Sequence, residues 1–312
     1  MFIMVEQKCE KVHSVVLLMS MGDSFMKKVC AENIDAFNIF PRKNLFFRII
    51  RRVWMLAKFP YCFIWFDKWK YQLEKYDTII VFASYLNPPL LHWIKKKYPK
   101  KRLILWFWDP VSNCANPSII KDRLCEKWSF DSLDCIKYGM RMNTTFYFSN
   151  LINSRVYTSK RDILFVGEDK GRLETLMSLE DQFRDLGLIT YFHIVFGDCS
   201  YLNKRKYRYK KKIPYDSVLE MAMESKAILE ILQNEQSGMS LRCMESLFLK
   251  VKLITNNPFV ATYDFYDPNN IFILGQDNLS DLPAFISTPY QNVSDLILRK
   301  YSIHCWIDRF FR

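Results

Sequence analysis

Short, uninterrupted apolar runs recur along the chain, and most are followed by a segment with helical character. They lie at 15–19, 78–83, 103–108, 163–166, 191–196, 227–232, 253–255 and 271–274. Continuous apolar runs of this length are typical of parallel strands that helices cover on both faces. Because these runs alternate with helical segments, the sequence predicts an α/β fold built on doubly wound parallel sheets.

The apolar runs form two series, which the polar segment 150–160 separates. The first series is expected to end in a short strand at 146–148. A length of 312 residues also agrees with two domains, since a domain typically holds about 100–200 residues. We therefore expect two Rossmann-like domains, over 1–155 and 156–312. Ligands of such domains bind beyond the carboxyl ends of the strands, and a cleft between two facing domains is the expected site.

The composition limits the partners and the compartment. Lys and Arg number 45 against 33 Asp and Glu, a net charge of +12 that favours anionic partners. The nine cysteines form no C-x-x-C pair and the four histidines no H-E-x-x-H motif, so we expect a reducing compartment and no metal site. Without a signal peptide or an apolar run of about 18 residues, a cytoplasmic protein is predicted.

The segment 166–172 follows a predicted strand and precedes a predicted helix. Gly167 and Gly171 permit a tight turn, and Lys170 and Arg172 place positive charge near a helix N-terminus, which itself attracts anions. A diphosphate would fit there. The segment matches neither G-x-G-x-x-G nor a Walker A loop, so a glycine turn with solvated charges remains the alternative.

A second polar segment, 233–246, connects a predicted strand to a predicted helix. Ser240 is a suitable N-cap, and Arg242 and Glu245 lie three residues apart on one helix face. This arrangement favours a binding corner over the alternative, an Arg–Glu surface pair beside a capped helix. Its candidate ligand-binding residues are Gln236, Ser237, Gly238, Ser240, Arg242 and Glu245.

These two segments resemble the donor-binding corner of GT-B glycosyltransferases. The likeness lies in the segment 236–246, in Lys252-Leu-Ile-Thr-Asn-Asn after it, and in Lys170-Gly171. It implies a nucleotide-sugar donor, with Glu245 hydrogen-bonded to the ribose and Lys170 near the phosphates. The family pattern has a second Glu eight positions earlier, where this chain has Ser237. Gln236, Ser237 or Glu235 would then take part of the sugar-contacting role. No cofactor is expected.

Further motifs are similar to bacterial proteins that build lipopolysaccharide core or other surface polysaccharides. They are Trp128-Ser-Phe-Asp131, Asp134, Lys137-Tyr138 and the segment 263–270, and the likeness covers about residues 100–280. The nearest kind is the core biosynthesis protein associated with rhamnose addition. The resemblance implies sugar transfer to lipopolysaccharide core, or a related lipid-linked oligosaccharide, at the inner membrane face.

A basic and aromatic segment near the N-terminus is a candidate membrane or acceptor site. A helix over 44–58 would place Phe47, Ile50, Trp54 and Ala57 on one face, flanked by three arginines. This pattern predicts an interfacial helix, peripheral to the anionic inner membrane. The alternative is an amphipathic helix packed on a sheet. The residues chosen for this site are Arg48, Arg51, Arg52 and Trp54.

A transferase also needs a base to deprotonate the acceptor hydroxyl. Asp109, after the run 103–108, and Asp23, after the run 15–19, are the two candidates, and either could instead be a turn or capping residue. No D-x-D pattern is present, so we expect metal-free chemistry in which Lys170, Arg172 and a helix N-terminus stabilise the leaving diphosphate.

The segment 204–212 contains seven basic residues and two tyrosines. No recognised nucleic-acid module surrounds it, so no nucleic-acid partner is expected, and a loop near phosphate groups or a solvated loop are the alternatives. Two other functions remain open for the whole chain: a basic protein that binds nucleic acid or another polyanion, and a GT-B domain that no longer catalyses.

Overall fold

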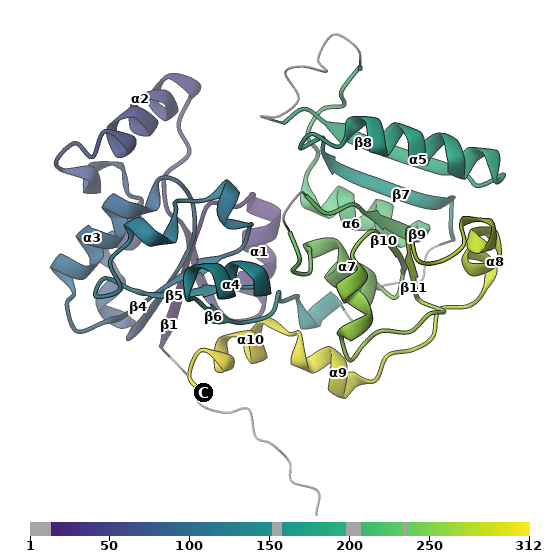
Figure 1. The fold of residues 1–312 in the computed structure, drawn as a ribbon. Helices are drawn as coiled ribbons and strands as arrows, with labels where there is room; N and C mark the ends of the chain where they lie inside the picture. The colour runs from purple at the N-terminus through teal and green to yellow at the C-terminus, as the bar shows by residue number, and fades with distance from the viewer. Residues whose placement is uncertain (1–13, 152–157, 198–206, 234–235) are drawn as a thin grey trace, which may run out of the picture. The chain divides into compact units, whose positions relative to one another are not determined.

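The computed structural model describes residues 14–151, 158–197, 207–233 and 236–312 (Figure 1). They form two compact units: the described residues up to Thr144 together with Ile303–Arg312, and those from Thr145 to Ser302. Each unit contains one parallel sheet with helices around it, of six strands in the first unit and five in the second. The predicted α/β class is confirmed.

The sheet of the first unit has the strand order β2-β1-β3-β4-β5-β6, and all its pairings are parallel. The next two strands along the chain, β2 and β3, pair with opposite edges of β1. The strand order of the sheet therefore reverses at β1. The elements of this unit are β1 (Val15–Met19), α1 (Asp23–Ala31), β2 (Asp35–Asn38), α2 (Leu45–Leu56), β3 (Thr78–Phe82), α3 (Asn87–Lys97), β4 (Arg102–Phe107), β5 (Glu126–Ser129), α4 (Ser132–Tyr138), β6 (Arg141–Met142) and α10 (Ile303–Arg309).

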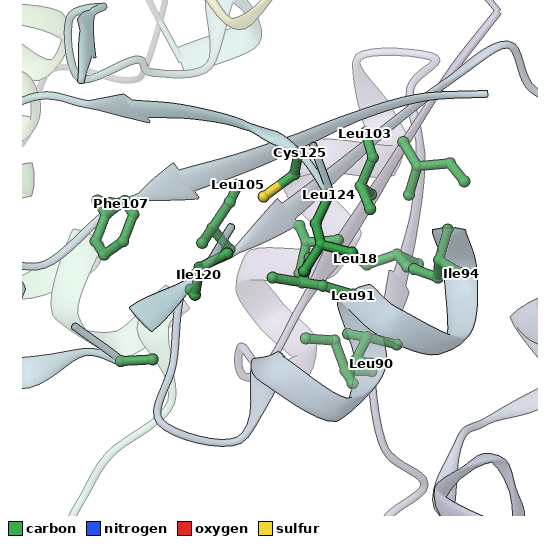
Figure 2. Close-up of a cluster of buried hydrophobic side chains, with 14 of the residues drawn as sticks. Leu18, Leu90, Leu91, Ile94, Leu103, Leu105, Phe107, Ile120, Leu124 and Cys125 are labelled. Carbon is green, nitrogen blue, oxygen red and sulfur yellow. The ribbon is translucent and has the colours of Figure 1, made fainter. Parts of the chain in front are cut away.

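The core of the first unit lies between the central strands and α3. Leu90, Leu91 and Ile94 project from α3 towards Leu103 and Leu105 of β4, as Figure 2 shows. All five side chains are at most 3% exposed. Burying a leucine or isoleucine contributes about 1.5–3 kcal/mol, so this interface fixes the helix on the sheet and holds the carboxyl ends of the strands in place.

The C-terminal helix α10 belongs to the first unit. Trp306 packs edge-on against Trp106 of β4 with ring centroids 5.3 Å apart, and against Phe310 at 4.8 Å. Arg309 Nε donates to the side-chain oxygen of Asn143 at 2.7 Å. These contacts place Ile303–Arg312 in the first unit, whereas the predicted bounds 1–155 and 156–312 assign the whole C-terminal tail to the second domain.

The sheet of the second unit has the strand order β11-β10-β9-β7-β8, again with parallel pairings. Strand β8 follows β7 on one side of it, and β9 then pairs on the other side. The elements are β7 (Arg161–Glu168), α5 (Leu173–Asp185), β8 (Thr190–Val195), α6 (Tyr215–Met223), β9 (Ser225–Glu230), α7 (Leu241–Leu249), β10 (Lys252–Thr255), β11 (Ile271–Ile273), α8 (Leu282–Ser287) and α9 (Asp295–Lys300).

One predicted strand is absent. The segment 146–148 forms no strand; Tyr147 makes a single bridge to Ser302 and lies in the second unit. The three aromatic side chains of this segment are fully buried, and the ring of Tyr147 packs on Phe248 of α7, at 5.2 Å between ring centroids. The apolar run 146–148 is therefore a buried connecting segment. Its side chains are as fully buried as those of a central strand.

Candidate functional site

The carboxyl ends of β7 and β9 lie side by side at the point where the chain order of the second sheet reverses. In open α/β sheets, this is where ligands bind, because the connections from the two strands leave in opposite directions and open a crevice. The loop from β7 to α5 and the loop from β9 to α7 meet here. Both polar segments singled out in the sequence therefore lie at one edge of this sheet.

Arg172 joins the two strand ends. Its guanidinium donates to the backbone oxygens of Glu168 at 2.9 Å and Asp169 at 3.2 Å, and also to the backbone oxygen of Ile231, just past β9. Burial, with a smaller contribution from the neighbouring Arg242, lowers the pKa of Arg172 to about 10. The group is still cationic at neutral pH. It is thus a fixed positive charge held by carbonyl oxygens.

Arg242 is the second cation at this edge. It lies in the first turn of α7, where the N-cap Ser240 accepts a hydrogen bond from its backbone N–H at 3.1 Å. Its guanidinium donates to the backbone oxygen of Val166 in β7. A Cβ on Gly167 would collide with this guanidinium. A side chain at position 167 would therefore displace the Arg242 guanidinium from this place, whereas the tight turn is made by Gly171, whose φ is +80°.

Glu245 lies one turn further along α7 and is only 5% exposed. The hydroxyl of Tyr215 donates to its Oε1 at 2.9 Å, and the hydroxyls of Tyr215 and Tyr147 are 2.8 Å apart. Burial raises the pKa of Glu245 to about 7, although Arg242 and Tyr215 act to lower it. At neutral pH the carboxyl is therefore close to half ionised, unlike a solvated glutamate.

A further acidic residue, Glu230 at the end of β9, was not singled out from the sequence. It is 1% exposed, and it accepts hydrogen bonds from the hydroxyls of Thr255, at 2.5 Å, and Ser240. A glutamate inside the otherwise apolar run 227–232 was the available signal. Because Ser240 both caps α7 and contacts Glu230, this carboxylate fixes the start of the helix that carries Arg242.

The sugar-facing part of the predicted corner is held by its own loop contacts. The side-chain amide of Gln236 donates to the backbone oxygen of Gly238 at 3.1 Å, and that of Asn257 to the backbone oxygen of Ser237 at 3.4 Å. Glu235, the other candidate, lies outside the described residues. Gln236, Ser237 and Gly238 thus shape the loop, and their contact with a sugar stays a prediction.

Part of the basic stretch lies against the loop that carries Lys170. Residues 204–206 are outside the described residues, but the segment 207–212 makes two contacts to the end of β7 and the loop after it. Tyr209 donates from its hydroxyl to Asp169 at 2.5 Å, and the Lys212 ammonium lies 2.6 Å from a carboxylate oxygen of Glu168. The stretch therefore adds positive charge beside the β7–α5 loop.

In the first unit, both candidate bases lie at the carboxyl edge of the sheet. Asp23 is the first residue of α1, after β1, and Asp109 follows β4. The aromatic rings of Phe25, two residues after Asp23, and Trp108, directly before Asp109, have centroids 5.8 Å apart. Asp23 is paired with the guanidinium of Arg42, and both side chains are exposed.

Helix α2 orients its side chains differently from the expected arrangement. Trp54 faces inward, where its ring packs on Trp65 at 6.1 Å and its indole N–H donates to the backbone oxygen of Pro60 at 2.9 Å. Arg51 also turns inward, with its guanidinium 4.3 Å from the ring centre of Phe40. Only Arg48 and Arg52 of the four predicted residues are exposed.

The outward side of α2 is apolar. Five large side chains there are each between 53% and 67% exposed: Leu45, Phe46, Ile49, Val53 and Leu56. We call this set the α2 ridge. Figure 1 shows α2 standing clear of the sheet of the first unit. In the described part of the chain, no helix is both long and apolar enough to cross a bilayer.

Comparisons with known proteins bear on the fold. No protein-family model and no curated protein matches the chain. The solved structure of sucrose-phosphate synthase from Thermosynechococcus elongatus is similar over 96% of this chain and 98% of its own, with a TM-score of 0.52 and 11% identity. An α-glucosyltransferase in complex with UDP and a 13-mer DNA containing a central A:G mismatch matches over 95% and 92%, with a TM-score of 0.50 and 10% identity.

The fold is that of GT-B glycosyltransferases. At such low identity the likeness shows the fold alone. Among the described residues, no group of three or more His, Cys, Asp or Glu side chains is arranged to hold a metal ion.

Proposed function

We propose that this protein is a glycosyltransferase that binds a nucleotide-sugar at the carboxyl edge of its second sheet. The observation that carries the proposal is the pair of arginines at the ends of β7 and β9, with Glu245 on the same helix as Arg242. A nucleotide-sugar needs a cationic site for its diphosphate and a hydrogen-bond acceptor for its ribose. The site supplies both within one loop–helix unit.

The arginines would stabilise the negative charge that develops on the leaving diphosphate. Because Arg172 and Arg242 are held by backbone oxygens, they need little reorganisation when that charge appears, which is the condition for electrostatic catalysis. Lys170 lies in the same β7–α5 loop. We propose that these cations take the part that a metal ion plays in other transferases.

For the base, we propose Asp109. Both candidates lie at the carboxyl edge of the first sheet. Asp109 lies just beyond β4, one of the two middle strands of that sheet, whereas Asp23 is exposed in the first turn of α1. Changing Asp109→Asn should remove turnover and leave nucleotide affinity intact, while Asp23→Asn should retain turnover. A normal rate in the Asp109 variant, measured as release of nucleoside diphosphate, would assign the base elsewhere.

The donor site is tested by titration calorimetry with UDP, GDP, ADP and dTDP. At least one of these should bind, and Arg242→Gln should weaken that binding by about tenfold or more, since a hydrogen bond to a charged group contributes about 1.5–3 kcal/mol. Arg184→Gln is the matched control, because Arg184 lies in the last turn of α5 and pairs with Glu180. Equal losses in both variants, or no binding by the wild type, would contradict the proposal.

We further propose that the acceptor is a glycolipid of the anionic inner membrane face, of the lipopolysaccharide core or a related surface polysaccharide. The sequence motifs support the acceptor class, including the kind of protein associated with rhamnose addition. The α2 ridge supports the membrane, because exposed apolar side chains flanked by Arg48 and Arg52 suit an anionic bilayer surface.

Membrane binding is tested by co-sedimentation with vesicles of phosphatidylglycerol and phosphatidylethanolamine. The pair Ile49→Ser with Val53→Ser should release the protein, as should Arg48→Glu with Arg52→Glu. Ile136→Ser is the control, since Ile136 of α4 is 81% exposed yet outside the ridge. If the ridge variants sediment like wild type, the membrane proposal is wrong. Tight, salt-sensitive binding of DNA without any nucleotide-sugar binding would instead support a polyanion-binding protein.

A further inference from the structure

We propose that Tyr215 is a positioning residue for nucleotide recognition, which holds the Glu245 carboxylate so that its second oxygen accepts a hydrogen bond from the ribose. This inference rests on the proposed function. It assigns to Tyr215 a role that its position in the sequence does not suggest, since it lies 30 residues before Glu245 and outside both polar segments.

The geometry consists of a chain of three side chains from three parts of the second unit. Tyr147 contributes the first hydroxyl, and Tyr215, the first residue of α6, contributes the second at 2.8 Å. Tyr215 then donates to Oε1 of Glu245 at 2.9 Å. Pro214 precedes Tyr215 at the N-cap, and its ring fixes the backbone φ there. The hydroxyl that contacts Glu245 is therefore fixed by a helix start and by a second tyrosine.

The far end of this chain is equally rigid. Tyr147 is fully buried, its backbone N–H donates to the backbone oxygen of Tyr301 at 2.8 Å, and its ring packs on Phe248. Phe248 follows Glu245 by three residues on α7, so both lie on the same helix face. The aromatic contact and the hydrogen bonds thus fix the same face of α7 at two neighbouring positions.

The two oxygens of Glu245 are in different situations. Oε1 accepts the hydrogen bond from Tyr215, whereas no hydrogen bond to Oε2 is present among the residues that the structure describes. A carboxylate with one oxygen held and one available has a defined orientation. Such an oxygen suits a ribose hydroxyl, because hydrogen bonds to a charged acceptor are about twice as strong as those between neutral groups.

Four ionisable groups surround this carboxyl. Arg242 from α7 and Tyr215 from α6 favour its charged form, Glu230 from β9 opposes it, and Tyr147 acts through Tyr215. Burial is the largest effect and raises the pKa of Glu245 to about 7. Removing the Tyr215 hydroxyl would raise this pKa further. Ribose recognition by the carboxylate would then require a higher pH in the variant than in the wild type.

The experiment compares Tyr215→Phe with wild type by calorimetry, using UDP, GDP, ADP and their 2′-deoxy and 3′-deoxy forms, at several pH values around neutrality. In the wild type, the ribo form that binds should bind about tenfold more tightly than at least one of its deoxy forms. The affinity of the ribo form should rise with pH through about 7. In Tyr215→Phe the preference for ribose should be largely lost near neutral pH, and the pH midpoint should move upward.

The matched control is Tyr290→Phe. Tyr290 lines a small cavity with Cys243 of α7, and Cys243 lies about 200° around the helix from Glu245. This variant also loses a tyrosine hydroxyl next to α7, yet it should keep both the ribose preference and the pH profile. Circular dichroism of each variant shows whether the fold is retained. If Tyr215→Phe does not fold, Tyr147→Phe should show the same upward shift of the pH midpoint, but a smaller one.

A preference for ribose and a pH profile that are unchanged in Tyr215→Phe would overturn the positioning role while leaving the donor site in place. Absence of binding of all of these nucleotides, and of dTDP as well, to the wild type would instead refute the proposed function itself. A loss of affinity that is the same for ribo and deoxy forms would show a merely structural role for Tyr215, and would also overturn the inference.

Discussion

Glu245→Gln should make the second unit more stable above neutral pH while weakening nucleotide binding. The wild-type carboxyl has an ordinary pKa of 4.5, which burial raises to about 7 in the folded protein. Between these values the unfolded chain releases a proton that the folded chain keeps, so folding stability falls as the pH rises through this window. Above it, at about 1.4 kcal/mol per pH unit, the cost amounts to about 3 kcal/mol.

Glutamine has the size of a protonated glutamate and accepts from Tyr215 in the same way, but it cannot ionise. The variant should therefore match the wild type at about pH 4.5 and exceed its stability by up to about 3 kcal/mol at about pH 8.5. A gain in stability at the expense of binding is common at functional sites, where a buried charge is kept for its interaction with a ligand.

The assay is urea unfolding at both pH values, followed by two signals. All eight tryptophans lie in the first unit, so their fluorescence reports that unit, whereas far-ultraviolet circular dichroism reports both. The fluorescence transition should be the same in wild type and variant. Circular dichroism also detects unfolding of the second unit. At the higher pH, this transition should occur at a higher urea concentration in the variant than in the wild type. Parallel stability curves for the two proteins across this range would refute the burial argument.

Three further predictions concern other contacts. Gly167→Ala should weaken nucleoside diphosphate binding by about tenfold, because the new Cβ displaces the Arg242 guanidinium. Calorimetry measures this affinity, and the control variant is Gly22→Ala, where a Cβ meets nothing within 4 Å. Trp306→Ala should destabilise the first unit by about 3–5 kcal/mol in urea unfolding, since it empties a fully buried site against Trp106. Glu32 raises the pKa of His304, so this pair stabilises the first unit below about pH 6.5 and loses its effect as the pH rises through the raised pKa; Glu32→Gln should flatten that dependence in thermal unfolding followed by fluorescence.

The central strands could be predicted because burial on both faces leaves only apolar residues in them. Strands β1, β3 and β4 were located within one residue at each end. The strands β2, β5 and β6 were missed, since they lie at or next to the edges of the first sheet and contain residues such as Asp35, Glu126 and Arg141. An edge strand is half solvated, so its sequence carries no continuous apolar signal. Tertiary contacts, not the local pattern, make these segments strands.

From the sequence, only those residues of the candidate site that lie within a continuous segment could be predicted. Arg172, Arg242 and Glu245 lie in two loop–helix segments whose order along the chain places them at the ends of neighbouring parallel strands. The partners of these residues come from elsewhere: Tyr215 and Tyr147 lie 30 and 98 residues from Glu245 in the sequence. A side chain that acts through a hydrogen bond from another element leaves no periodic pattern. For the same reason the sequence predicts only a turn at Gly167, whereas the structure places the Arg242 guanidinium against it.

Helix α2 shows how a correct helix can be assigned the wrong outward face. Apolar residues surround most of its circumference, so periodicity alone permits either Trp54 or Ile49 to face outward. The segment after the helix decides which face turns outward. Pro60 and Trp65 contact the side that carries Trp54, and the α2 ridge stays exposed. Arg51 is drawn inward with Trp54, whereas Arg48 and Arg52 stay beside the ridge. The argument for a membrane surface therefore rests on the α2 ridge, which is mostly aliphatic, and not on the face that carries Trp54. Two arginines accompany the ridge, Arg48 and Arg52, in place of the three expected.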